Sequence, residues 1–192
     1  MKNIILQHWT GELGPLELAS KANMEKYAKQ CGAEYELILG NQFHPKLHGC
    51  YQKLIMLDKR FDKYQDTLMV DLDMFVVKNV KDNVFDVPGV GLNSKVQKDI
   101  FKAMCKGKKY RSVTDRNGPF WGGAIWKFTN AQRKQLRKFI VDDEMKIFTQ
   151  NYVDEGIIHR LASQAGLKQI DIPEEWCWGN CFPGYEKAKM IH

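Results

Sequence analysis

The segment at residues 67–77 constrains the fold more than any other part of this chain. Residues 67–70 are almost entirely apolar, and the acids Asp71 and Asp73 follow them directly. A continuous apolar run of this kind is typical of a strand inside a parallel sheet that helices cover on both faces. The segment therefore predicts an α/β fold. It also places two carboxylates at the carboxyl end of an interior strand, which is where open α/β sheets bind ligands.

Strands and helices alternate in the rest of the predicted order, which is the pattern of a layered α/β domain. Further strands are predicted at residues 3–9, 35–39 and 167–172. Helices are predicted from about residue 15 to Cys31, over 50–64, after the caps Thr129 and Asn130, and from Asp154 onward. The helix at 50–64 is predicted to be amphipathic, because its apolar residues are spaced four, three, four and three apart. These residues are Cys50, Leu54, Leu57, Phe61 and Tyr64.

Composition excludes several classes of protein. The chain has 192 residues, of which 44% are apolar and 27% charged, so one globular domain over residues 1–192 is expected. Ten Phe, seven Tyr and five Trp residues exclude a disordered chain. No window of about 18 apolar residues is free of charge, which excludes a membrane span. The first residues resemble a strand rather than a secretion signal, and the five cysteines form an odd number, so a cytoplasmic protein is expected.

The net positive charge is concentrated in one segment. The chain carries 29 basic and 23 acidic residues, a net charge of +6, and residues 95–116 hold eight basic and two acidic residues. The rest of the chain is therefore neutral, whereas proteins that coat nucleic acid spread basic residues over a face or groove. We expect no nucleic-acid partner. The segment is interpreted as a flap that attracts an anionic small molecule, with an anionic surface or a solvated loop as the alternatives.

Asp71 and Asp73 indicate a bound cation. Burial of one unpaired carboxylate costs several kcal/mol, and two acids so close together also repel each other. A Mg²⁺ or Mn²⁺ ion, held by carboxylate oxygens and sharing its other positions with phosphates, would offset both effects. The alternatives are exposed acids at the end of a strand, or acids that pair with Lys or Arg.

Several segments, in this order along the chain, resemble the nucleotide-sugar glycosyltransferases of GT-A fold. They are Lys53 on the helix before the motif, the strand with Asp71-Leu72-Asp73, the small-residue segment 120–123, the acids Asp154 and Glu155, and residues 189–192. The resemblance covers nearly the whole chain and is strongest to the short glycosyltransferase domains encoded by large algal viruses. It implies a Rossmann-like domain with a mixed, mostly parallel central sheet flanked by helices. Such a fold normally continues further, which leaves open that residues 1–192 are the first part of a longer protein.

The resemblance implies a metal site formed by Asp71, Asp73 and His192. Asp73 is expected to be the principal ligand, and Asp71 to bind either the metal or the ribose of the donor. Imidazole is more usual on transition metals than on Mg²⁺, so Mn²⁺ is the expected cofactor and Mg²⁺ the alternative. A terminal histidine that is simply solvated is the other interpretation of His192.

The resemblance also assigns donor and acceptor sites. The residues expected to bind the donor are Gln7, Trp9 and Thr10 at the base, Lys53 at the diphosphate, and Asp71 and Leu72. The residues expected to contact the sugar or the acceptor are Trp121, Gly122, Gly123 and Asp154. Asp154 and Glu155 are the expected catalytic acids. Core packing is the alternative role for Trp9, and plain solvation is the alternative for Lys53.

Together these segments predict a metal-dependent glycosyltransferase that moves a hexose or deoxyhexose from a UDP-sugar to a glycan or glycoprotein acceptor. The histidine ligand favours retention of configuration, whereas inversion would require a carboxylate such as Asp154 to act as general base. One alternative is a haloacid-dehalogenase-type phosphatase with Asp71 as nucleophile. That family usually has its acidic motif close to the N-terminus, whereas here two other elements precede the acidic strand. This position disfavours the phosphatase. The other alternative is a non-enzymatic module that binds an anionic polymer.

Overall fold

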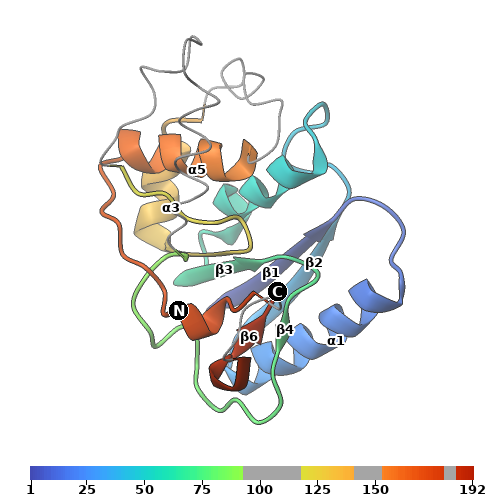
Figure 1. Ribbon diagram of the computed structural model, residues 1–192. Helices are drawn as coiled ribbons and strands as arrows, with labels where there is room; N and C mark the ends of the chain where they lie inside the picture. Colours follow the sequence, from blue (N-terminus) through green and yellow to red (C-terminus); the bar gives the residue numbers. More distant parts are fainter. Residues whose placement is uncertain (93–117, 141–152, 180–184) are drawn as a thin grey trace.

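The computed structural model describes residues 1–92, 118–140, 153–179 and 185–192 (Figure 1). Their central element is a four-stranded sheet in the order β2-β1-β3-β5. Its strands are β1 (Ile4–Trp9), β2 (Glu34–Leu39), β3 (Asp66–Val70) and β5 (Ile125–Thr129). β1 pairs in parallel with both β2 and β3, and β5 runs antiparallel to β3. The predicted mixed, mostly parallel sheet is confirmed.

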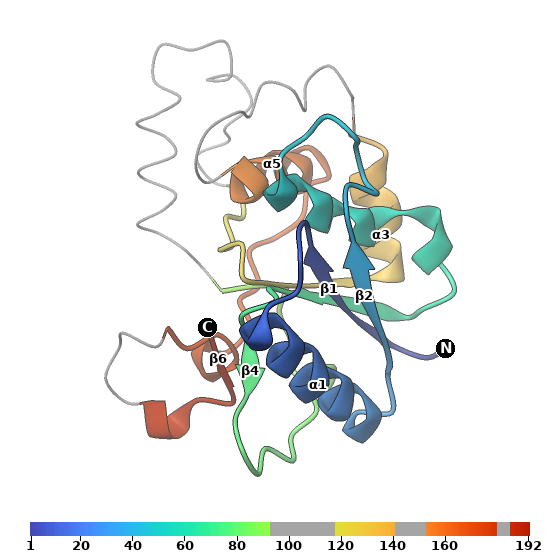
Figure 2. The same ribbon diagram turned by 90° about the vertical axis from the view of Figure 1, so that its right-hand side faces the viewer.

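Each face of the sheet is covered by a separate layer (Figures 1 and 2). On one face lie α1 (Pro15–Gln30) and a small sheet formed by β4 (Phe75–Val76) and β6 (Met190–Ile191). On the other lie the 3₁₀-helix η1 (Gly49–Leu57), α3 (Asn130–Arg137) and α5 (Val153–Gln164). Single 3₁₀ turns are η2 (Lys59–Phe61), η4 (Glu174–Trp176) and η5 (Tyr185–Lys187). A separate hydrophobic core lies between the sheet and each layer. Successive side chains of β1 point into opposite cores, with Ile4 and Leu6 in one and Ile5 in the other.

Local sequence explains where the two best-defined helices begin and end. Pro15 opens α1 at the first helical position, where its missing N–H leaves no hydrogen bond unmade. Gly32 follows the end of α1 with a φ of 65°, a backbone conformation that glycine adopts without strain. Thr129 caps α3: its side chain accepts from the backbone N–H of Gln132, and the Gln132 side chain accepts from that of Thr129. The predicted cap at Thr129 is confirmed.

Two sequence predictions differ from the structure. The segment predicted as an amphipathic helix at 50–64 is the 3₁₀-helix η1 followed by the short turn η2, and residues 51–57 are all buried. Residues 51–57 lie between the sheet and the helices α3 and α5, so this part of the segment has no solvent-facing side. The strand predicted at 167–172 is extended chain that forms a single bridge, between Gly91 and Asp171.

A completely buried arginine ties α3 to the chain that leads into β3. Arg133 donates hydrogen bonds to the backbone carbonyls of Phe128, Phe61 and Tyr64, at 2.7, 3.0 and 2.9 Å. None of its side chain reaches solvent. The carbonyl of Phe61 also accepts from the backbone N–H of Tyr64, and the carbonyl of Tyr64 also accepts from Asn130 Nδ2. The guanidinium therefore adds a second, charged hydrogen bond to each of these two carbonyls, and its removal takes those bonds out of the interior.

We predict that Arg133→Met destabilises the protein by about 3 kcal/mol, because three hydrogen bonds from a buried charged group to backbone carbonyls are lost. Urea unfolding followed by circular dichroism measures the difference. The matched control is Lys134→Met, which changes the neighbouring exposed residue on α3 and should leave the unfolding free energy within about 0.5 kcal/mol. Equal stabilities of the two variants would contradict the role of Arg133.

Candidate functional site

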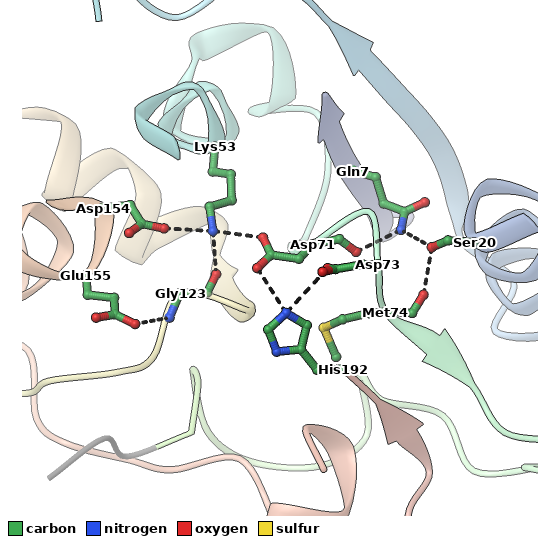
Figure 3. Close-up of polar contacts among 10 residues, drawn as sticks. All are labelled: Gln7, Ser20, Lys53, Asp71, Asp73, Met74, Gly123, Asp154, Glu155 and His192. Carbon is green, nitrogen blue, oxygen red and sulfur yellow. Dashed lines mark hydrogen bonds and ion pairs between the residues drawn. The ribbon is translucent and has the colours of Figure 1, made fainter. Parts of the chain in front are cut away.

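Two acids and one histidine converge where β3 ends. Asp71 and Asp73 lie in the turn between β3 and β4, and His192 follows β6, which pairs with β4. His192 Nε2 lies 3.4 Å from Asp73 Oδ1 and 3.7 Å from Asp71 Oδ2 (Figure 3). The backbone N–H of His192 donates to the carbonyl of Trp178, which further fixes the end of β6. Pairing of β4 with β6 therefore places the histidine against the acidic turn.

The donor atoms of these three residues fit a divalent ion. One ligand atom from each residue can be chosen so that all lie within 4.8 Å of one another. Two ligands that bind one Mg²⁺ or Mn²⁺ ion at about 2.1 Å are at most roughly 4.2 Å apart, so small side-chain rotations suffice. Two carboxylates and an imidazole are a donor set suited to Mn²⁺. The hydrogen bond between His192 and Asp73 raises the pKa of the imidazole and lowers the pKa of the carboxyl.

A buried lysine connects the acidic turn to α5. Lys53 Nζ lies 2.8 Å from Asp71 Oδ1 and 2.7 Å from Asp154 Oδ2, and donates to the carbonyl of Gly123 at 2.8 Å. Burial pushes the pKa of Lys53 down, but the charges of Asp71 and Asp154 outweigh it and raise the pKa overall. The side chain of Lys53 is 9% exposed, so its positive charge interacts with these protein groups rather than with solvent. The pairing of Asp71 with a lysine is the alternative that the sequence left open, and here it coexists with the possible metal site.

Gly123 joins this network through both of its peptide groups. Its N–H donates to Glu155 Oε1 at 2.9 Å, while its carbonyl accepts from Lys53. A Cβ here would lie 2.7 Å from Asp154 Oδ2 and 3.3 Å from Lys53 Nζ. The position thus requires glycine because the ion pair passes so close to the backbone. This contact gives a structural reason for a glycine that the sequence associated with a sugar.

Glu155 is a buried carboxyl group with one unused oxygen. Its side chain accepts from Gly123 through Oε1, whereas Oε2 is buried and has no hydrogen-bond partner among the residues that the structure describes. Burial raises the pKa of Glu155 to about 7, and the negative charges of Asp154 and Asp71 add to that effect. The neutral acid is therefore the favoured form below neutral pH.

A pocket of about 300 Å³ adjoins the acidic turn at the carboxyl ends of β1 and β3. Six residues predicted from the sequence line it: Trp9, Thr10, Lys53, Asp71, Leu72 and Asp73. The indole N–H of Trp9 donates to the carbonyl of Glu12, which fixes the ring at the pocket wall. The volume is at the lower end of the range for small-molecule sites. The structure therefore brings most of the predicted donor site together.

Two predicted contact residues lie in the interior instead. Gln7 is completely buried and hydrogen-bonds to protein groups with both ends of its amide. The ring of Trp121 is also completely buried and packs edge-on against Phe128, with centroids 6.1 Å apart. Gly122 is partly buried, and its N–H donates to the carbonyl of Leu92. In this structure neither Gln7 nor Trp121 offers a side-chain surface to a ligand.

Four residues that line the pocket were not predicted from the sequence. They are His8, His48, Gly49 and Cys50. His8 Nε2 contacts the carbonyl of Gly40 at 2.9 Å, and burial lowers the pKa of His8. A Cβ on Gly49 would lie 2.6 Å from Thr10 Oγ1, so this glycine lets the loop approach the end of β1. His8 could have been found, because it lies between Gln7 and Trp9; the loop at 48–50 gives no such indication.

The basic segment at residues 95–116 lies outside the described residues. Its role as a flap therefore stays a prediction. Among the described residues, no helix has the length and apolar character needed to cross a membrane.

No protein-family model and no curated protein sequence matches the chain. Among solved structures, the chain is similar to the crystal structure of a glycosyltransferase involved in the glycosylation of the major capsid of PBCV-1. The two share 10% sequence identity with a TM-score of 0.60, over 100% of this chain and 93% of the other. Similarity at this identity shows the fold alone. The GT-A-like α/β fold predicted from the sequence is confirmed.

We predict that Glu155 makes the protein less stable as the pH rises. Its carboxyl holds a proton up to about pH 7 when folded, whereas the ordinary value is 4.5. Folding therefore favours the protonated form, and stability falls by up to about 3 kcal/mol between pH 4.5 and pH 8. Urea unfolding at pH 5 and pH 8 should show this component in the native protein and not in Glu155→Gln. The exposed Glu174→Gln variant is the control and should follow the native protein at both pH values. An unchanged pH dependence in Glu155→Gln would contradict the assignment.

Proposed function

We propose that this protein is a glycosyltransferase that uses a divalent metal ion and a UDP-sugar donor. The observation that carries the proposal is the convergence of Asp71, Asp73 and His192 beside a pocket at the carboxyl ends of β1 and β3. A metal site next to a pocket is what transfer from a nucleoside diphosphate requires, because negative charge develops on the leaving diphosphate. The similarity in fold to a glycosyltransferase supports the same class.

The proposed roles follow from where the residues lie. A Mn²⁺ or Mg²⁺ ion held by the two acids and the histidine would supply Lewis-acid stabilisation of the leaving diphosphate. Trp9 and Thr10 are assigned to the nucleoside, because they line the pocket at the end of β1. Lys53 offsets the charge of Asp71, which lowers the repulsion between the acidic turn and an approaching diphosphate.

Asp154 is proposed to face the reacting sugar. Its carboxylate is paired with Lys53 at 2.7 Å and is 11% exposed. Because Lys53 holds this carboxylate in a short ion pair, we assign Asp154 to stabilise positive charge on the anomeric carbon rather than to act as general base. Glu155 is proposed to support Asp154 indirectly. It accepts from the N–H of Gly123, whose carbonyl accepts from the Lys53 that pairs with Asp154. This division of roles fits retention of configuration.

The donor sugar is proposed to be a hexose or deoxyhexose, and the acceptor a glycan or glycoprotein. The similar glycosyltransferase takes part in glycosylation of a capsid protein, which supports a protein-linked acceptor here. The single domain, the cytoplasmic location and the viral origin inferred from the sequence stay predictions.

We predict that UDP binds only weakly without metal and on the order of 10- to 100-fold more tightly with Mn²⁺, because an ion held by Asp71, Asp73 and His192 would offset the negative charge of the diphosphate. Isothermal calorimetry with UDP, in Mn²⁺ and in EDTA, measures the difference. Asp73→Asn should abolish the metal dependence. Glu25→Gln removes the same charge from an exposed ion-paired position on α1 and should bind UDP as the native protein does.

If Asp73→Asn binds UDP as tightly as the native protein in Mn²⁺, the assignment of Asp73 to a metal site is wrong. Hydrolysis of p-nitrophenyl phosphate by the native protein, lost in Asp71→Asn, would instead support the phosphatase. Binding that needs no metal and falls steeply with salt would support the polymer-binding module.

Retention predicts the stereochemistry of the product. With an α-linked UDP-sugar as donor, proton NMR of the product should show an α linkage, and Asp154→Asn should lower turnover by roughly 100-fold or more. A β linkage would assign inversion, and Asp154 would then be the general base.

A further inference from the structure

The turn that carries the two acids is held mainly by groups outside its own strands. β3 ends at Val70 and β4 begins at Phe75 in a different sheet, so residues 71–74 have no continuous strand partner. The N–H of Asp71 donates to the carbonyl of Ala124, and the N–H of Met74 donates to the carbonyl of Asp71. Two backbone carbonyls of the turn, those of Asp71 and Met74, receive further hydrogen bonds from side chains.

Those bonds come from Gln7 on β1 and Ser20 on α1, both completely buried (Figure 3). Gln7 Nε2 donates to the carbonyl of Asp71 at 3.1 Å and to Ser20 Oγ at 3.0 Å. Ser20 Oγ donates to the carbonyl of Met74 at 2.7 Å. The far end of the amide, Gln7 Oε1, accepts from the hydroxyl of Tyr35 at 2.8 Å. One chain of hydrogen bonds therefore runs from β2 through β1 and α1 to both ends of the turn.

The direction of every bond in this chain is fixed by its acceptors. A backbone carbonyl only accepts, so the amide nitrogen of Gln7 faces Asp71 and the hydroxyl proton of Ser20 faces Met74. Ser20 Oγ must then accept from Gln7. No member can reverse without leaving a buried group unpaired, which costs about 1–3 kcal/mol. The turn is therefore held in one conformation.

The same turn carries the side chains of Asp71 and Asp73. The carbonyl of Asp71 belongs to the peptide unit between residues 71 and 72, and the carbonyl of Met74 to the unit between residues 74 and 75. A change in their positions therefore shifts the backbone at both ends of the turn, and so moves both carboxylates relative to His192. Mutation of the groups that orient metal ligands commonly lowers metal affinity by 10- to 100-fold. Neither Gln7 nor Ser20 lines the pocket or contacts any of the three candidate ligand side chains.

We propose that Gln7 and Ser20 are positioning residues that set the spacing of the metal-binding acids by holding the turn at residues 71–74. This inference rests on the proposed function, since it assumes that Asp71, Asp73 and His192 bind a metal. It replaces the contact with a nucleotide base that the sequence suggested for Gln7. A mutation at either residue should weaken metal binding although it touches neither the metal nor the donor.

The test measures the affinity of the protein for Mn²⁺ alone, from the loss of the free-ion signal in electron paramagnetic resonance. Ser20→Ala and Gln7→Met each remove the hydrogen bonds to the turn and should weaken Mn²⁺ binding about tenfold. Tyr35→Phe is the matched control, because it removes a hydrogen bond from the same amide without touching the turn. It should bind Mn²⁺ within about twofold of the native protein.

Arg133→Met controls for general loss of stability, since Arg133 contacts no residue of the turn. Thermal unfolding is recorded for every variant, and Mn²⁺ affinity is compared at a temperature where all are folded. Arg133→Met should be destabilised and bind Mn²⁺ as the native protein does. If Gln7→Met does not fold, Ser20→Ala decides the outcome, because it deletes a single buried oxygen.

Each result has a distinct meaning. Weaker Mn²⁺ binding by Ser20→Ala, with native-like binding by Tyr35→Phe and Arg133→Met, supports the proposal. Equal Mn²⁺ binding by Ser20→Ala and the native protein overturns it and leaves the metal site intact. Equal weakening in Arg133→Met also overturns it, because stability would then account for the effect. A native protein that binds no Mn²⁺ removes the proposed function itself, and the positioning role with it.

Discussion

The candidate site depends on one buried positive charge. Lys53 lies between Asp71 and Asp154, so three chain segments far apart in the sequence meet at a single ammonium group. Without that charge, the partly buried carboxylate of Asp71 and the nearly buried carboxylate of Asp154 would face each other, and their desolvation would be uncompensated. The third proton of the ammonium group is directed to the carbonyl of Gly123, which leaves no hydrogen-bonding capacity unused. The lysine thus fixes η1, the acidic turn and α5 relative to one another.

The fold could be predicted from the sequence where local pattern decides structure. The apolar run before Asp71 has no alternation, and it forms a strand buried between two layers, as such runs do. Thr129 caps the helix that it was expected to cap, and the first helix begins at Pro15, where the predicted turn was expected to end. The segment at 50–64 failed for a physical reason. Its spacing matches an amphipathic helix, but residues 51–57 are buried on all sides, which removes the difference between faces that the spacing assumes.

The candidate site was predictable in its residue types and less so in its contacts. The acids and His192 come together because short β4 pairs with short β6, a pairing that no local pattern encodes. Lys53 could be singled out as a basic residue, but its partners lie on other elements, and so its burial was not foreseeable. Gln7 was placed in the right region with the wrong role, since a buried amide and a ligand-binding amide look the same in a sequence.

The origin of His192, the third candidate metal ligand, has a consequence for folding. Asp71 and His192 come from opposite halves of the chain, so the centre exists only after a long-range loop has closed. Contacts of this kind form late relative to local helices, because the entropy of closure is lost before they contribute. A folding intermediate that has built β1, α1 and β3 alone would hold both acids but no complete centre. Binding of a metal ion would then stabilise the fully folded chain relative to partly folded chains, because only the folded chain holds all three ligands.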